Sequence, residues 1–375
     1  AEVIMHIRKH YVEEKSFEDI AYGALHGMLQ EMDPHSDFLE PTAYEGLKED
    51  TRGSFSGIGI HIGIRRGILT VIAPIEDTPA FRAGLISGDR IIEIDGESTS
   101  GLSLRDAGSR LRGEKGSSVT IKVIRQGEDD ALDVTIVRDD IEVPSVKGAR
   151  LLTDRIGYIR ITQFAEPTAA LLQEALEQLL DEGMEALVLD LRSNPGGLLV
   201  SAVQVAEKFI DEGDVVVSTR GRLRDGEQDV KKASGPLHYT DLDIAVLVNG
   251  GSASAAEIVA GCLQDHNRAI LVGEQSWGKG TVQNVIPIQR GQSALKLTTS
   301  SYWRPSGEHI DRYDDIAKET NRWGVHPDPG FEVEQTDEDV FNNVRARSIR
   351  ELQGLLTPEE ARQVSDIRAF EPDKT

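Results

Sequence analysis

The chain has 375 residues, a length typical of two or three domains. It carries 41 basic and 64 acidic residues, and this net charge of −23 disfavours nucleic acid or anionic lipid as a general partner. Apolar residues make up 39% of the chain, which is ordinary for a protein that buries sizeable cores. No apolar run reaches the ~18 residues of a membrane span. The single cysteine, Cys262, excludes an intrachain disulfide and a cysteine-based metal cluster.

Residues 1–52 are expected to form an N-terminal helical segment. Ser16 has the features of a helix N-cap, and Asp33 followed by Pro34 ends the run. Between them, apolar side chains recur at steps of three and four, which predicts one apolar stripe along a helix. The stripe consists of Phe17, Ile20, Ala21, Ala24, Leu25, Met28, Leu29 and Met32.

Residues 53–140 are dense in short strands and turns, which predicts one small mixed domain. A helix is expected near 103–111, with strands at 117–125 and 131–138.

Residues 141–335 have the pattern of an α/β domain. Alternating buried strands and helices predict a sheet rich in parallel strands, with chemistry at the carboxyl ends of the strands. Strands are expected at 157–164, 186–191, 244–248 and 269–272, and helices at 168–180, 198–209 and from Ala255 to Leu263. Residues 336–375 are acidic and helical in patches, and are expected to dock on the core or to mediate assembly.

Three glycine-rich loops each follow a predicted buried strand, at 194–197, 250–254 and 273–280. The third, G-x-x-x-x-G-K-G, is similar to a Walker A loop, but no Ser or Thr follows Lys279. A strand-like run follows where a phosphate-binding loop needs a helix, which disfavours nucleotide binding. The spacing from Ser276 to Lys279 fits the S-x-x-K string of penicillin-binding enzymes, but that motif also needs a helix, so the match is attributed to chance.

Ser254 lies where a predicted strand passes into a helix, and two interpretations of it stay open. Ser254 and Glu257 form a capping box, S-x-x-E, which stabilises a helix start. A nucleophilic serine at this point would have the N–H of Ala255 aimed at an oxyanion, with a second donor from Gly196 or Gly197.

A histidine is one kind of base for Ser254. His266 lies about 12 residues along the same helix, roughly 18 Å away at ~1.5 Å per residue, so it cannot contact Ser254. Three other histidines stay open as partners, namely His61, His309 and His326. Cys262 lies in the apolar stripe of that helix and is interpreted as inert core.

Lys279 is the other kind of base. If a strand begins there, Lys279, Thr281 and Gln283 share one face, because side chains alternate along a strand. A surface lysine is the simpler interpretation. The glycines on both sides and the neighbouring Trp277 favour a partly buried amine.

Several motifs together resemble one family. VNGGSASAAEIVAGCLQDHNRAILVGEQSWGKGTVQ at 248–283 and DLRSNPGG at 190–197 resemble the carboxyl-terminal processing peptidases, the tail-specific serine proteases of family S41. AFRAGLISGDRIIEIDG at 80–96 is similar to PDZ domains, and DPHS at 33–36 matches the family's N-terminal segment. The resemblance spans about residues 10–335. It implies a multidomain α/β and α+β protein with a PDZ domain at 53–140 and a crotonase/ClpP-like peptidase core at 141–335.

The resemblance also implies site residues. The nucleophile falls on Ser254, the base on Lys279 and the residue that orients the base on Gln283. The oxyanion donors fall on the backbone N–H of Ala255 and of a glycine in N-P-G-G, where Gly197 is preferred to Gly196. The carboxylate-binding loop of the PDZ domain comprises Gly57, Ile58, Gly59 and Ile60.

Departures from the family pattern are small. Ala256 and Ser276 stand where Ser and Thr are expected, and the section 307–328 is longer than the usual link. Arg112, at the end of the PDZ helix, is either a sensor of the bound tail or a solvated charge.

The implied function is a serine endopeptidase, without a cofactor, that binds protein C-terminal tails and cleaves near them. The resemblance also implies a periplasmic location, with any export signal removed. A homo-oligomer or an activating adaptor stays open. The alternatives are a non-catalytic PDZ scaffold for protein C-termini and a crotonase-like acyl-CoA enzyme; intact Ser254 and Lys279 disfavour the first, and the fused PDZ domain disfavours the second.

Overall fold

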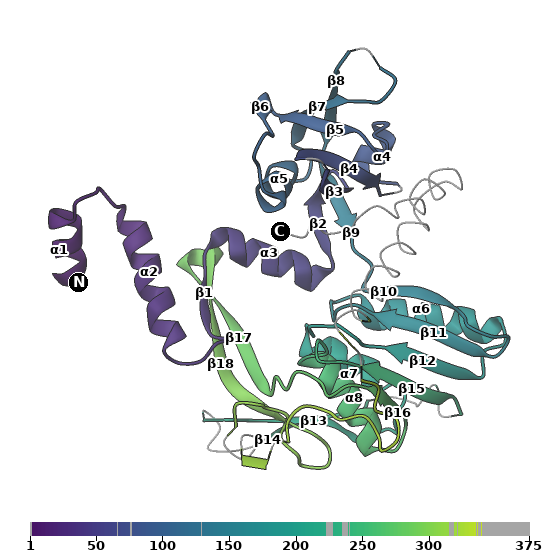
Figure 1. The fold of residues 1–375 in the computed structure, drawn as a ribbon. Coiled ribbons are helices and arrows are strands. Elements are labelled where there is room, and N and C mark those ends of the chain that lie inside the picture. The colour runs from purple at the N-terminus through teal and green to yellow at the C-terminus, as the bar shows by residue number, and fades with distance from the viewer. Residues whose placement is uncertain are drawn as a thin grey trace. The chain divides into compact units, whose positions relative to one another are not determined.

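The computed structural model describes residues 2–334, except 66, 76, 129, 223–227, 235–238, 240, 315–318 and 321, together with Thr336 and Asp339. The helical segment expected at 336–375 therefore falls almost wholly outside the described residues. The chain divides into two compact units (Figure 1). One combines Ala1–Gly53 with Pro144–Glu334, and the other contains Ser54–Val143. None of the helices in the described ranges has the length and apolarity that a bilayer crossing requires.

The first unit is built on a five-stranded sheet whose central strands are parallel, as the sequence pattern predicts. Its order is β10 (Val146–Leu151), β11 (Ile156–Ile161), β12 (Ala186–Asp190), β15 (Asp243–Val248) and β16 (Ile270–Gly273), with β10 antiparallel to β11. The helices that follow the parallel strands are α6 (Thr168–Asp181), α7 (Leu199–Ala206) and α8 (Ala255–Asp265).

These strands and helices enclose the main hydrophobic core, because each contributes an apolar face. Leu172, Leu176 and Leu179 of α6 are fully buried, at the spacing of one helix face. Strands β12 and β15 are apolar on both faces, as expected for parallel strands covered on both sides. Cys262 is fully buried in α8, and burial raises the pKa of its thiol to about 12, so it behaves as inert core.

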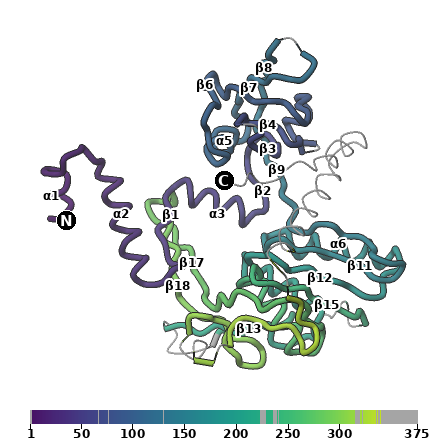
Figure 2. Tube along the Cα trace, in the orientation of Figure 1, coloured from purple at the N-terminus to yellow at the C-terminus, as the bar shows by residue number. Residues whose placement is uncertain are grey.

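A second, antiparallel sheet belongs to the same unit. Its order is β1 (Asp37–Leu39), β18 (Ser293–Trp303), β13 (Val215–Gly221) and β14 (Gln228–Lys232), with β17 (Thr281–Ile288) also paired to β18 and the short 3₁₀ turn Gln289–Gly291 between the two. Figure 2 shows β1, near the N-terminus, running beside β18. Local periodicity predicts only part of β17, because these strands are specified by pairing partners far away in the sequence.

The N-terminal helices are α1 (Glu2–His10), α2 (Phe17–Gln30) and α3 (Pro41–Arg52). Ser16 caps α2 as expected, since its hydroxyl accepts a hydrogen bond from the N–H of Asp19 at 2.9 Å. The apolar stripe of α2 is largely exposed: Leu29 is its one buried residue, whereas Phe17 is 57% and Met28 59% exposed.

The second unit is a small sheet domain. Its main sheet has the order β3 (Ile60–Arg65), β4 (Ile68–Pro74), β5 (Arg90–Ile94), β7 (Ser118–Ile124) and β8 (Leu132–Val137), with β6 (Glu97–Ser98) on β5. A separate pair joins β2 (Ser54–Gly57) to β9 (Asp139–Glu142), and the helices are α4 (Pro79–Arg82) and α5 (Leu104–Leu111). The expected helix at 103–111 is confirmed as α5, with Ser103 as its N-cap.

Candidate active site

The three glycine-rich loops meet because β12, β15 and β16 are adjacent parallel strands that end at the same edge of the sheet. The N–H of Ala253 donates to the carbonyl of Asn194 at 2.9 Å, which joins the first loop to the second. The N–H of Trp277 donates to the carbonyl of Ser252 at 2.9 Å, which joins the second to the third. The sequence expectation that these loops converge is therefore confirmed.

Ser254 is held in an uncommon backbone conformation at the start of α8. Its φ is 56° and its ψ is −115°, a left-handed φ that a non-glycine residue adopts only when the surrounding structure enforces it. Ser254 is only 5% exposed. A Cβ on Gly196 would lie 2.8 Å from the Ser254 Cβ and 3.0 Å from the Ala255 nitrogen, so the first loop packs directly on this serine.

Two backbone N–H groups are candidate donors, that of Ala255, which follows Ser254, and that of Gly197, which follows the Gly196 packed on this serine. Among the described contacts, neither the N–H of Ala255 nor that of Gly197 donates a hydrogen bond. The N–H of Gly196 instead donates to the Asn194 side chain at 2.8 Å. The N–H groups of Ala255 and Gly197 are thus the available donors, and that of Gly196 is already used.

Glu257 ties the serine to the third loop. Its carboxylate accepts the N–H of Ser254 at 2.7 Å and the N–H of Lys279 at 2.9 Å. It also accepts the N–H of Gly278 at 2.6 Å and the hydroxyl of Ser276 at 2.5 Å. Burial raises the pKa of this fully buried carboxyl, and these donors oppose the rise. The capping box in the sequence reveals only the first of these four contacts.

Lys279 lies two residues before β17 and is partly buried, in agreement with the sequence expectation. Burial lowers the pKa of its amine, the nearby Lys296 lowers it further, and the charge of Glu257 opposes the change. The amine therefore loses its proton more readily than an ordinary lysine.

Gln283 lies on the same face of β17 as Thr281. Its amide nitrogen donates to the hydroxyl of Thr281 at 2.9 Å and to that of Thr298 at 3.1 Å. Thr298 in turn donates to Asp33 at 3.1 Å through its hydroxyl and to the Ser36 hydroxyl at 3.0 Å through its N–H. The segment before β1 therefore fixes Thr298, and Thr298 in turn orients Gln283.

Two further residues at this site are not among the predicted site residues. Tyr302 is buried on β18 near Ser254; burial raises the pKa of its phenol and the interaction with the Ser254 side chain opposes the rise. His35 lies near Lys279, since burial and then the charge of Lys279 lower the pKa of its imidazole. The D-P-H-S match is the one signal that marks His35, and no comparable signal marks Tyr302.

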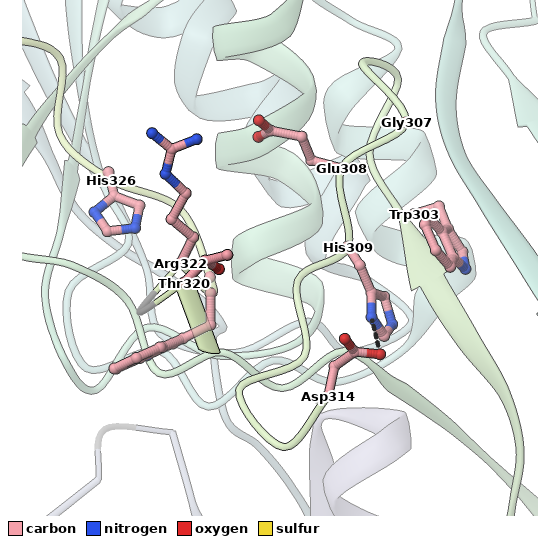
Figure 3. Close-up of a pocket in the computed structure, with 10 residues that line it drawn as sticks. Trp303, Gly307, Glu308, His309, Asp314, Thr320, Arg322 and His326 are labelled. Carbon is pink, nitrogen blue, oxygen red and sulfur yellow. Dashed lines mark ion pairs between the residues drawn. The ribbon is translucent and has the colours of Figure 1, made fainter. Parts of the chain in front are cut away.

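The histidines left open by the sequence have other contacts. His309 pairs with Asp314 at 3.3 Å and stacks on Trp303 with 4.6 Å between ring centroids (Figure 3). Burial lowers the pKa of His326. His61 belongs to the other compact unit. None of the three has a described contact with Ser254.

The pocket in Figure 3 has a volume of about 530 Å³. It is lined by Trp303, Gly307, Glu308, His309, Asp314, Thr320, Arg322, Trp323, Gly324 and His326. Most of these residues come from the section 307–328 that the family resemblance marks as unusually long. In the described part of the chain, no group of three or more His, Cys, Asp or Glu could hold a metal ion.

The predicted carboxylate-binding loop of the second unit joins β2 to β3. The carbonyl of Ile58 accepts the N–H of Ala80 at 2.8 Å. Gly59 has a φ of 77°, and a Cβ there would lie 2.4 Å from the Thr78 Cβ, so this position requires glycine. Gly57 ends β2 and Ile60 begins β3. The guanidinium of Arg112 lies 4.6 Å from the ring centroid of Phe55.

Comparison with known proteins identifies both units. The family described as Peptidase family S41 matches residues 155–329, and the PDZ domain matches residues 70–125. A carboxy-terminal-processing protease of Bartonella bacilliformis is 42% identical over 82% of this chain and 71% of its own length. The carboxy-terminal processing protease CtpA of Bacillus subtilis is 34% identical over 82% of this chain and 65% of its own length.

Among solved structures, one from Bacteroides fragilis described as an S41 protease has a TM-score of 0.50 at 15% identity. It covers 89% of this chain and 90% of its own, and it supports the fold alone. The sequence identities extend over both the peptidase core and the PDZ domain. The chain therefore belongs to the carboxy-terminal processing proteases of peptidase family S41.

Proposed function

We propose that this protein is a serine endopeptidase that binds protein C-terminal tails through its PDZ domain and cleaves near them with Ser254 and Lys279. The observation that carries the proposal is the buried Glu257 carboxylate, which accepts the N–H groups of both residues. This one carboxylate thereby joins the loop at 250–254, which we call the nucleophile loop, to the loop at 273–280, which we call the base loop.

Lys279 supplies the base. A free lysine, with a pKa near ~10.4, is protonated at neutral pH and cannot accept a proton. Burial and Lys296 lower the pKa of Lys279, which makes the neutral amine available. The amide nitrogen of Gln283 is bound to Thr281 and Thr298, which leaves its carbonyl oxygen to accept an N–H from Lys279 and orient the amine.

The reaction proceeds through an acyl-enzyme. The Ser254 Oγ attacks the peptide carbonyl carbon while its proton passes to the Lys279 Nζ. The C–N bond then breaks, and the Lys279 ammonium gives that proton to the leaving amine. Water attacks the ester carbonyl, Lys279 takes the water proton, and its return to Ser254 releases the acid product.

The N–H groups of Ala255 and Gly197 form the oxyanion hole in this proposal. Ala255 directly follows Ser254, Gly197 directly follows the Gly196 that packs on this serine, and neither N–H donates within the described contacts. Such preorganised donors are aimed at the charge that develops during attack, where they are most effective. The Asn194 contact of the Gly196 N–H supports the preference for Gly197.

The PDZ domain supplies recognition of the tail. Backbone N–H groups of the loop from Gly57 to Ile60 would hold the terminal carboxylate, and β3 would pair with the tail as an added strand. Arg112 stays a hypothesis as a sensor of the bound tail. The family resemblance also supports a periplasmic location.

The proposal is tested by cleavage of an unfolded protein with an apolar C-terminus, with products read by mass spectrometry. We expect Ser254→Ala and Lys279→Ala to abolish turnover while retaining the wild-type unfolding transition. Lys208→Ala is a matched control, because burial also lowers the pKa of this lysine, and within the described residues its amine donates to Gln173 at 2.8 Å. Turnover by Lys279→Ala at the wild-type rate would refute the role of Lys279 as the base for Ser254.

Tail recognition has a separate test. Peptides that differ only in a free or amidated C-terminus should differ in cleavage and in binding to Ser254→Ala. Equal cleavage of the free and the amidated peptide would refute binding of the terminal carboxylate by the PDZ domain. Tail binding without cleavage by the wild type would instead support the non-catalytic scaffold.

A further inference from the structure

Two short stretches, 310–312 and 323–325, pack against the base loop. We call these two stretches the brace. The N–H of Arg312 donates to the carbonyl of Gly278 at 2.9 Å, next to Lys279. The N–H of Ser276 donates to the carbonyl of Val325 at 3.0 Å. The two stretches are joined to each other, since the N–H of Gly324 donates to the carbonyl of Ile310 at 2.8 Å.

The brace approaches the base loop as closely as backbone allows. A Cβ on Gly278 would lie 2.4 Å from the Trp323 Cδ1, and one on Gly280 would lie 2.4 Å from the Asp311 nitrogen. A Cβ on Gly324 would lie 2.4 Å from the Ser276 Oγ. The G-K-G pattern, which is similar to a phosphate-binding loop, thus serves contact between two protein segments.

The Ser276 hydroxyl joins the brace to the catalytic residues. It donates to the Glu257 Oε1 at 2.5 Å and accepts the N–H of Val325 at 2.8 Å. Ser276 is only 3% exposed, so water cannot replace either partner. Glu257 in turn accepts the N–H groups of Ser254 and Lys279.

We propose that Ser276 is a positioning residue through which the brace fixes the relative placement of Ser254 and Lys279. This inference rests on the proposed function and adds a role for the long section 307–328. The hydroxyl is the essential group, because alanine would leave the buried N–H of Val325 without its acceptor and would remove one of the two donors to the Glu257 Oε1, with only the Gly278 N–H remaining. A threonine retains the hydroxyl, so it can make both bonds.

Loss of the Ser276 hydroxyl changes the pKa of Lys279 as well as the position of the base loop. The low pKa of Lys279 depends first on burial, so a loosened base loop lets the amine contact water and raises its pKa toward the ordinary value. The charged or titratable groups that face Lys279 are Glu257 from α8, Lys296 from β18 and His35 from the segment before β1. Asp33 and Asp311 also act on His35. A change at Ser276 leaves four of these five groups unaltered, whereas Glu257 loses a hydrogen bond that lowers its pKa.

The test compares the full chain with Ser276→Ala, Ser276→Thr and a matched control. Ser145→Ala is that control, because Ser145, just before β10, is fully buried and its hydroxyl contacts that of Thr168, the first residue of α6, at 2.7 Å, with no described contact to the base loop. We expect Ser276→Ala to lower kcat/KM about 10- to 100-fold, mainly through kcat, as for a displaced catalytic group. The pH at which kcat/KM rises should be higher in Ser276→Ala than in the wild type. Ser276→Thr should restore most of kcat/KM and most of its pH dependence. Ser145→Ala should alter only the unfolding midpoint.

A second measurement is independent of cleavage. The acetylation rate of Lys279 by acetic anhydride, followed across pH by peptide mass spectrometry, reports the titration of its amine. We expect the midpoint to be higher in Ser276→Ala than in the wild type, and to return in Ser276→Thr.

The inference is overturned if Ser276→Ala keeps the wild-type titration of Lys279, or if Ser276→Thr is impaired as much as Ser276→Ala. A wild type that cleaves nothing would defeat the proposed function alone, because the acetylation measurement would still decide the role of Ser276.

Discussion

Replacing Gly278 by alanine adds one methyl group beside Lys279, the proposed base, without removing any polar contact. Gly278 has a φ of +81°, which costs an L-residue about 1–2 kcal/mol. The new Cβ would lie 2.4 Å from the Trp323 Cδ1, whereas ordinary contacts begin at 3.4 Å, so something must move by about 1 Å. Overpacking of this kind costs about 1–3 kcal/mol, which gives a total of about 2–5 kcal/mol. If the base loop moves by that distance, kcat/KM falls about 100-fold.

Gly307→Ala provides the matched control. Gly307 has a φ of +84°, and a Cβ there has no neighbour within 4 Å, so only the backbone cost of about 1–2 kcal/mol applies. Urea unfolding and cleavage kinetics would be measured on both variants. Equal losses of stability in the two variants, with kcat/KM of Gly278→Ala unchanged, would refute the claim that Trp323 limits the space beside Lys279.

Three further changes have defined outcomes. Lys296→Ala removes a like charge, so the pKa of Lys279 should rise and the pH at which kcat/KM increases should move upward; a downward move would contradict the electrostatic account. Burial raises the pKa of Asp190, but its pair with Arg192 holds it below the ordinary value, so the pair's stabilising effect is present at neutral pH and is lost as pH falls through that lowered pKa. Arg192→Ala should therefore cost about 3–5 kcal/mol in urea unfolding at pH 7 and less in acid, and a cost independent of pH would argue against it. Gly59→Ala should weaken binding of a tail peptide in fluorescence anisotropy while the first unit keeps its unfolding transition, and unchanged binding would remove this loop from the tail site.

Local sequence pattern predicts the parallel strands and the loops that follow them. The reason is that β12 and β15 are largely apolar, as parallel strands covered on both faces are. Each is followed by a glycine-rich loop, which marks the point where the loops pack together. The capping box marks Ser254 and Glu257, and the flanking glycines mark Lys279. Each of these signals is contained within a few residues, so it is readable without the fold.

The remaining contacts of the site join residues that are far apart along the chain. Glu257 accepts the N–H of Lys279 from 22 residues away, and Thr298 donates to Ser36 across 262 residues. Tyr302 and His35 reach the site through the pairing of β18 with β17 and β1, which depends on register and not on local periodicity. The family resemblance supplies the D-P-H-S match but no contact, so the neighbourhood of Lys279 follows only from the structure.

The peptidase unit is made from two separate stretches of chain, whereas the described strands of the PDZ domain all lie in the one stretch Ser54–Val143 between them. On a ribosome, the PDZ domain has all its strands as soon as β9 has emerged. The segment before β1 must wait until Thr298 has been synthesised before its hydrogen bonds to β18 can form. A nascent chain that already contains Ser254 and Lys279 therefore still lacks Tyr302 and the support of Gln283. The order of synthesis delays assembly of the peptidase site until after the PDZ domain has been synthesised.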